Sequence, residues 1–191
     1  MKSWPALPTV RLEPAGQVTS AFIMRGISDF REAGRYLYRL PYGRNADRSD
    51  FTLVLSEGRG TCSTKHALLA ALAREQGIPI RLMLAIYQMD EANTPGVGAV
   101  LDKYGLGCIP EAHCYVSHGG DSIDITRSGV EPTAPVGPFL MEEVISPEQT
   151  GDYKLQRHQL FMRSWTGGGD PARNFDELWK IREECIAALE Q

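Results

Sequence analysis

Residues 60–81 read GTCSTKHALLAALAREQGIPIR and carry the strongest structural signal in the chain. Alanine and leucine recur there at the spacing of one helical face, which predicts a helix over residues 62–76. Gly77 suits the left-handed position that follows a helix, and Pro79 prevents its continuation. The largely apolar residues 80–87 then predict a buried strand.

Cys62 lies at the first turn of this predicted helix, directly after a loop that contains Gly58 and Gly60. The first N–H groups of a helix have no partner within the helix and carry the positive end of its dipole. A thiolate there is stabilised, which lowers the pKa of a cysteine from about 8.5 towards neutrality. The same N–H groups can bind the oxyanion that forms when a thiolate attacks a carbonyl. Cys62 is therefore a candidate nucleophile.

Two short strands are predicted further along the chain, over residues 112–117 and 122–126. Gly119-Gly120 between them is typical of a hairpin turn. A two-residue turn at these glycines places His118 opposite Asp121 and fixes the register of the two strands.

This register selects the partners of the nucleophile. It places His113 and Asp124 on one face of the sheet as diagonal neighbours, about 7–8 Å apart at the backbone. It places Asp121 on the opposite face, and a turn with an odd number of residues would reverse the choice. We therefore predict His113 as the base that exchanges a proton with Cys62, and Asp124 as the acid that orients it.

The other segments are assigned from apolar spacing and from the signals that begin and end helices. They are an extended segment over residues 8–24, a helix between Ser28 and Pro41, a short helix near 99–104, a helix from the capping box at Ser146 to Trp165 weakened by Gly151, and a last helix opened by Asn174 or Pro171. Together they predict an α+β fold in which the nucleophile helix packs on a small, mostly antiparallel sheet with flanking helices. We expect one domain over residues 1–191, with a core at about 28–130 and C-terminal helices at about 147–190.

Composition excludes several classes of protein. Of the 191 residues, 42% are hydrophobic and 23% are charged, which is typical of a globular protein. The net charge of −4 argues against a nucleic-acid partner. The first residues have no signal-peptide pattern, and no apolar run approaches the ~20 residues of a membrane span. With four cysteines and no such signal, we expect reduced thiols, a cytoplasmic location and no membrane association.

Three blocks of the sequence resemble the transglutaminase-like superfamily. Gly60-Thr61-Cys62, with its apolar helix and Gly77-Ile78-Pro79-Ile80-Arg81, resembles that family's nucleophile helix and following strand. Ala112-His113-Cys114-Tyr115-Val116 resembles its histidine strand, and Ile123-Asp124-Ile125-Thr126 its Asp-x-Thr strand. The blocks follow the family order of Cys, His and Asp and span roughly residues 53–127.

The resemblance implies a papain-like core in which Cys62 attacks an amide or ester carbonyl and forms a thioester, with His113 and Asp124 completing a triad. The substrate it implies is a peptide or another amide-containing molecule, and we predict no cofactor and no metal. The family includes protein cross-linkers, peptidases, glycan-releasing amidases and members that have lost activity. Animal transglutaminases carry a tryptophan near the oxyanion site and calcium sites. The tryptophans here, Trp4, Trp165 and Trp179, are remote in sequence, so we predict neither calcium binding nor cross-linking.

Two other functions and one other base are compatible with these residues. His66 lies one turn after Cys62 and is an alternative base. The pairs Cys62/His66 and Cys114/His118 share one spacing and could form a Cys2His2 zinc site, although a metal would consume the thiolate. The third alternative is a catalytically silent binding module on the same fold.

A few further side chains have expected roles. We expect Glu111 to be solvated rather than to line the pocket, and Cys108 and Cys185 to be packing residues. The second donor of an oxyanion hole is not identified by any motif, and Gln17 and Asn45 are only polar candidates for it.

Overall fold

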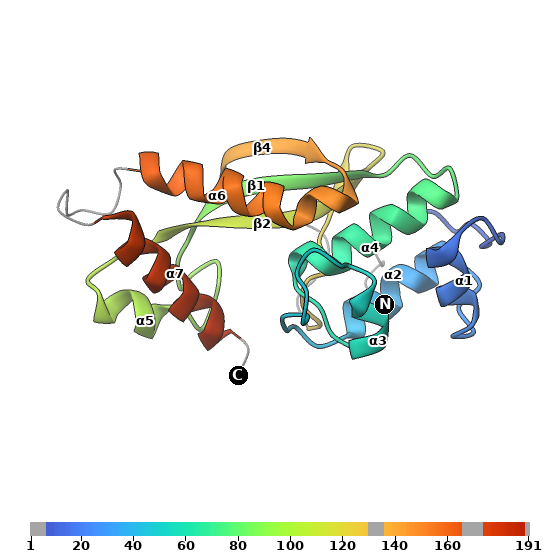
Figure 1. The fold of residues 1–191 in the computed structure, drawn as a ribbon, viewed down its shortest axis with the longest axis horizontal. Helices are drawn as coiled ribbons and strands as arrows, with labels where there is room; N and C mark the ends of the chain where they lie inside the picture. Colours follow the sequence, from blue (N-terminus) through green and yellow to red (C-terminus); the bar gives the residue numbers. More distant parts are fainter. Residues whose placement is uncertain (1–6, 130–135, 166–173, 190–191) are drawn as a thin grey trace. The chain divides into compact units, whose positions relative to one another are not determined.

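The computed structural model describes residues 7–129, 136–165 and 174–189 (Figure 1). The helices are α1 (Gln17–Ile23), α2 (Phe30–Arg39), α3 (Leu53–Glu57), α4 (Cys62–Glu75), α5 (Gly98–Lys103), α6 (Asp152–Ser164) and α7 (Phe175–Ala188), with a 3-10 helix at Pro147–Thr150. The strands are β1 (Arg81–Met89), β2 (Ile109–His118), β3 (Asp121–Ile123) and β4 (Phe139–Ile145). They form one small antiparallel sheet in the order β3-β2-β1-β4, which confirms the predicted α+β class.

The chain divides into two compact units, and three of the boundaries between them fall inside β1, β2 and β4. The first unit is formed by Met1–Leu84, Cys114–Pro135 and Glu143–Gly151. The second unit is formed by Ala85–His113, Val136–Glu142 and Asp152–Gln191. The single domain expected over residues 1–191 stays a prediction.

Helix α4 is the centre of the first unit, where α1, α2 and α3 pack against it (Figure 1). Every residue from Cys62 to Ala73 is buried, so the helix is surrounded on all sides rather than on one face. Its bounds confirm the helix predicted over residues 62–76. Gly77 follows with a φ of +65°, the left-handed conformation predicted for that glycine.

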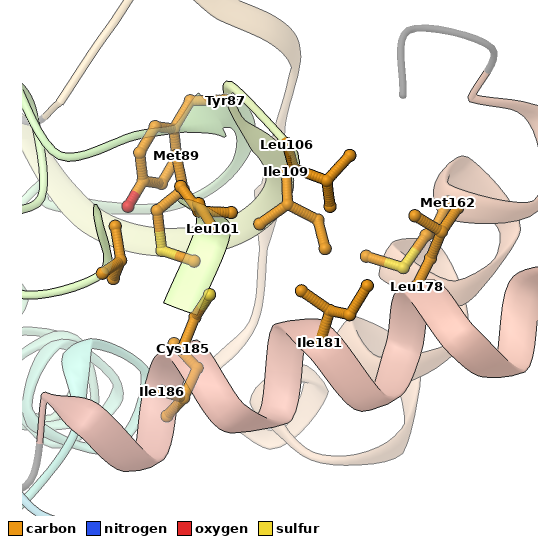
Figure 2. Close-up of a cluster of buried hydrophobic side chains, with 11 residues drawn as sticks. Tyr87, Met89, Leu101, Leu106, Ile109, Met162, Leu178, Ile181, Cys185 and Ile186 are labelled. Atoms are coloured by element: carbon orange, nitrogen blue, oxygen red, sulfur yellow. The ribbon is translucent and has the colours of Figure 1, made fainter. Parts of the chain in front are cut away.

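The second unit has a core of its own (Figure 2). Its buried members are Tyr87, Met89, Val97, Leu101, Leu106, Ile109, Met162, Leu178, Ile181, Cys185 and Ile186. Trp165 and Trp179 pack against this cluster, while Trp4 lies outside the described residues. Cys185 is a packing residue, as predicted, and burial, with Glu111 and Glu184 nearby, raises the pKa of its thiol to about 11.

A buried ion pair joins β2 to α7 in the second unit. Arg182 donates from Nε and Nη2 to the two carboxylate oxygens of Glu111, at 2.6 Å each. Burial alone would raise the pKa of Glu111, but Arg182 and His158 outweigh it and hold that pKa at about 2. Glu111 is only 6% exposed, so the expectation of a solvated carboxylate was wrong.

Two of the elements expected from the sequence were wrong, one because of a distant contact and one because of a local break. Residues 17–23 are helical rather than extended, since the carboxylate of Glu75 accepts the N–H groups of Val18 and Thr19 at 3.1 and 2.7 Å and caps α1. The helix predicted from Ser146 to Trp165 is two elements, because Gly151 separates the 3-10 helix from α6.

Most other boundaries agree with the prediction to within a residue or two, but β2 begins at Ile109, three residues before the predicted strand, and helix α3 was not predicted. The capping box at Ser146 is present, and Asn174 caps α7, whereas Pro171 lies outside the described residues. Asp29 rather than Ser28 caps α2. Strand β4 was not predicted at all. None of the described helices has the length and apolar character needed to cross a membrane, and the cytoplasmic location stays a prediction.

Candidate active site

Cys62 is the first residue of α4, at a helix start that is closed by a reciprocal cap. Thr61 Oγ1 accepts the N–H of Thr64 at 3.5 Å, and Thr64 Oγ1 accepts the N–H of Thr61 at 3.0 Å. Cys62 is 8% exposed, and its Sγ lies 3.8 Å from Ser63 Oγ. Because Thr64 N–H is committed to the cap, it is not available to bind an oxyanion.

The loop before this cap is closely packed at Gly60. A Cβ at that position would lie 2.9 Å from Val54 Cγ2 and 3.0 Å from both Lys65 Cγ and Thr64 Oγ1. We expect Gly60→Ala to lower the free energy of unfolding by about 1–3 kcal/mol through overpacking, measured by urea denaturation. Gly107→Ala is the matched control, because a Cβ there meets nothing within 4 Å. Equal stability of the two variants would contradict this account.

Asp124 lies just beyond the observed hairpin, one residue after the end of β3. The register His118↔Asp121 is confirmed, but β3 ends at Ile123, so the strand expected over residues 122–126 was wrong beyond that point. Asp124 instead closes a turn, in which its Oδ1 accepts the N–H of Thr126 at 2.9 Å and also the Thr126 hydroxyl. The turn, and not a strand pairing with β2, therefore orients the Asp124 carboxylate.

His66, the alternative base, has both ring nitrogens bound to the backbone. Its Nε2 lies 2.8 Å from the N–H of Ile125, which can only donate, so Nε2 is the acceptor and carries no proton. The proton is then on Nδ1, which donates to the carbonyl of Cys62 at 2.7 Å. Asp124 Oδ1 lies 3.7 Å from Nε2, but a neutral ring without a proton there forms no ion pair. His66 thus has a structural role that does not favour it as a base.

Lys65 lies in the same part of the first unit and was not identified from the sequence. Its side chain is fully buried, and its Nζ donates to the carbonyl of Leu40 at 2.6 Å and to that of Thr126 at 2.9 Å. Burial lowers the pKa of Lys65 to about 8, and the charges of Asp124 and Cys62 act against that decrease. The first unit therefore brings Cys62 and Asp124 together around one buried ammonium group.

His113 belongs to the second unit, as the last residue of its segment Ala85–His113. It lies on β2 and is 7% exposed. Its ring packs edge-on against that of Tyr87, with 6.1 Å between the ring centroids. This contact restrains the imidazole within the second unit.

Neither polar candidate can serve as the second oxyanion donor: the amide hydrogens of Asn45 are engaged, and Gln17 lies too far away. Asn45 uses both amide hydrogens, which donate to Glu57 Oε2 at 2.9 Å and to the carbonyl of Arg59 at 3.0 Å. Gln17 begins α1, whose first turn is bound by Glu75 at the far end of α4. That end is about 20 Å from Cys62 at the rise of an α-helix.

None of the four cysteines, all of which lie in the described residues, forms a disulfide, and Cys114 is fully buried. Within the part of the chain that the structure describes, no three His, Cys, Asp or Glu side chains cluster so that they could hold a metal ion. The proposed Cys2His2 set, Cys62, His66, Cys114 and His118, is therefore not assembled. For His66 the reason is that its Nε2 lone pair is occupied by the Ile125 N–H.

Comparison with known families agrees with this architecture. The model of the transglutaminase-like superfamily matches residues 17–118, a region that includes Cys62 and His113 and ends before Asp124. The chain belongs to this superfamily, whose members are typically cysteine hydrolases or acyltransferases. No curated protein and no solved structure matches the chain.

Proposed function

We propose that the protein is a cysteine-dependent hydrolase or acyl transferase that acts on an amide-type bond through a covalent thioester on Cys62. The observation that carries the proposal is the position of Cys62 as first residue of α4, inside the region that matches the family. A helix start favours a thiolate through its N–H groups and dipole, and the N–H of Cys62 itself can stabilise the oxyanion.

In the first half of the proposed reaction, the Cys62 thiolate attacks the carbonyl carbon of the substrate. The C–N bond then breaks, and protonated His113 donates its proton to the leaving amine. The products of this half are a free amine and an acyl group bound to Cys62 as a thioester.

In the second half, water or a second amine attacks the thioester carbonyl while neutral His113 accepts a proton from the attacking group. The C–S bond breaks and releases a carboxylic acid or a new amide, which restores the Cys62 thiolate and protonated His113. Asp124 is proposed as the acid that orients His113 and favours its charged form without itself transferring a proton. The substrate class is a peptide or another amide-containing molecule.

Thiol reactivity tests this proposal directly. At pH 6.5 iodoacetamide is expected to label Cys62 before the other three cysteines, because only Cys62 has a substantial thiolate fraction at that pH. Peptide mapping over time measures the order of labelling. Cys108 is the matched control: it is more exposed than Cys62, and burial together with Asp90 raises the pKa of its thiol. Faster labelling of Cys62 than of Cys108 therefore cannot result from accessibility.

The opposite order would remove the nucleophile assignment. If Cys108 reacts first and Cys62 only after unfolding in urea, Cys62 is an inert buried thiol. The catalytically silent binding module would then describe the protein better than an enzyme does.

A further inference from the structure

Burial of a lysine side chain destabilises the folded state unless its charge interacts favourably with other groups. An ammonium group has three N–H donors, and removing it from water costs several kcal/mol before any compensating interaction. The Nζ of Lys65 has two carbonyl acceptors, Leu40 O and Thr126 O, and the side chain is 0% exposed. With a pKa of about 8, it still carries its charge at neutral pH.

Its place on α4 relates Lys65 to the candidate nucleophile. Residues three apart on a helix are neighbours on its surface, so the side chains of Cys62 and Lys65 share one face. The charged groups that act on Lys65 are Asp124 and Cys62, which favour its charged form, and Arg127, which opposes it. The ammonium group of Lys65 thus interacts electrostatically with both the candidate nucleophile and the candidate carboxylate.

The same lysine also fixes the turn that carries Asp124. Its bond to Thr126 O ties that turn to α4, and its bond to Leu40 O ties both to the end of α2. The next residue, His66, binds the N–H of Ile125 in the same turn. Two consecutive residues of α4 therefore hold a turn about 60 residues distant in sequence, one at the N–H of Ile125 and one at the carbonyl of Thr126.

We propose that Lys65 is a positioning residue for the thiol chemistry: its ammonium group holds the Asp124 turn beside the start of α4 and favours the thiolate of Cys62. The proposal rests on the function proposed for Cys62. It assigns Lys65 no contact with substrate and no proton transfer, only an effect through Cys62 and Asp124.

The test compares Lys65→Met, which removes the charge, with Lys65→Arg, which keeps it. The rate of Cys62 alkylation by iodoacetamide is measured from pH 5 to 10 in each folded variant. Lys65→Met is expected to lower the rate at pH 6.5 about tenfold and to move the midpoint of the profile to higher pH, because the thiolate loses its neighbouring cation. Lys65→Arg is expected to keep the midpoint near that of the unchanged protein. Lys103→Met, which removes an exposed lysine of the second unit, is the control.

The outcomes separate this inference from the proposed function. A merely structural Lys65 would lower the melting temperature of Lys65→Met without moving the midpoint, and that result would overturn the inference. Slow alkylation of Cys62 in the unchanged protein would instead contradict the proposed function, because the inference depends only on the difference between variants.

A second measurement does not require any Lys65 variant to fold. Coupling between two ionising groups is reciprocal, so the Cys62 thiolate must stabilise the charged form of Lys65 as much as Lys65 stabilises the thiolate. Cys62→Ser is therefore expected to move the titration of Lys65, followed by its 13Cε resonance, to lower pH. An unchanged titration would show that the two groups do not interact and would overturn the inference.

Discussion

Replacing His113 by alanine is expected to abolish turnover, with kcat for an activated ester or amide lowered by a factor on the order of 10⁴ or more. In the proposed mechanism this one residue protonates the leaving amine and later accepts the proton of the attacking water or amine. No other group is assigned to either step. Release of a chromogenic leaving group measures the effect, with Cys62→Ala defining the rate without a nucleophile.

Two carboxylates provide a matched pair of controls for this result. Asp124→Asn is expected to lower kcat by a smaller factor, on the order of 10²–10⁴, because an orienting acid does not transfer the proton. Asp121→Asn is expected to change little, since Asp121 is exposed and pairs with His118 at the closed end of the hairpin. Activity retained in His113→Ala, or lost in Asp121→Asn but not in Asp124→Asn, would require the site to be redrawn.

The second large effect is on stability. Arg182→Met is expected to lower the free energy of unfolding by about 3–5 kcal/mol, because it leaves the carboxylate of Glu111 buried without its partner. Urea denaturation at pH 7 measures this loss. Arg74→Met is the matched control: Arg74 also bonds a glutamate, Glu148, at 2.6 Å, but both side chains are more than half exposed. Loss of such a surface pair is expected to lower the free energy of unfolding by only about 0–1 kcal/mol.

The same pair predicts the pH dependence of stability. The pKa of Glu111 is about 2 in the folded protein, below its ordinary value of 4.5. A carboxyl group with a depressed folded pKa contributes stability above its unfolded pKa, and that contribution is lost as the pH falls from 4.5 towards 2. The difference between the unchanged protein and Arg182→Met is therefore expected to narrow between pH 5 and pH 3. A constant difference over that range would mean that Glu111 is not the group responsible.

Local signals were enough to predict the elements that carry the candidate site. The apolar spacing of residues 62–76 and the glycine at 77 identified α4, and with it the position of Cys62 at a helix start. The two glycines of the hairpin were enough to predict the register His118↔Asp121. These features depend on side chains within a few residues of one another, so a single sequence displays them. The resemblance of three motif blocks to the transglutaminase-like superfamily then predicted the family that the comparison shows.

The features that were not predicted depend on contacts between residues far apart in the sequence, and such contacts leave no periodic pattern in it. Helix α1 exists because Glu75, 57 residues from Val18, caps its first turn. A turn at Asp124 is present where a strand was predicted, and Lys65 and His66 bind the backbone of that turn. Lys65 is 61 positions from its partner Thr126, and His66 is 59 positions from its partner Ile125. The environment of a charged side chain also depends on such contacts. The sequence around Glu111 suggested a solvated carboxylate, but Arg182, 71 positions later, pairs with it in the interior. Sequence spacing predicts which residues share a face of one helix or strand, whereas the desolvation and pairing of a charge depend on which elements meet in space.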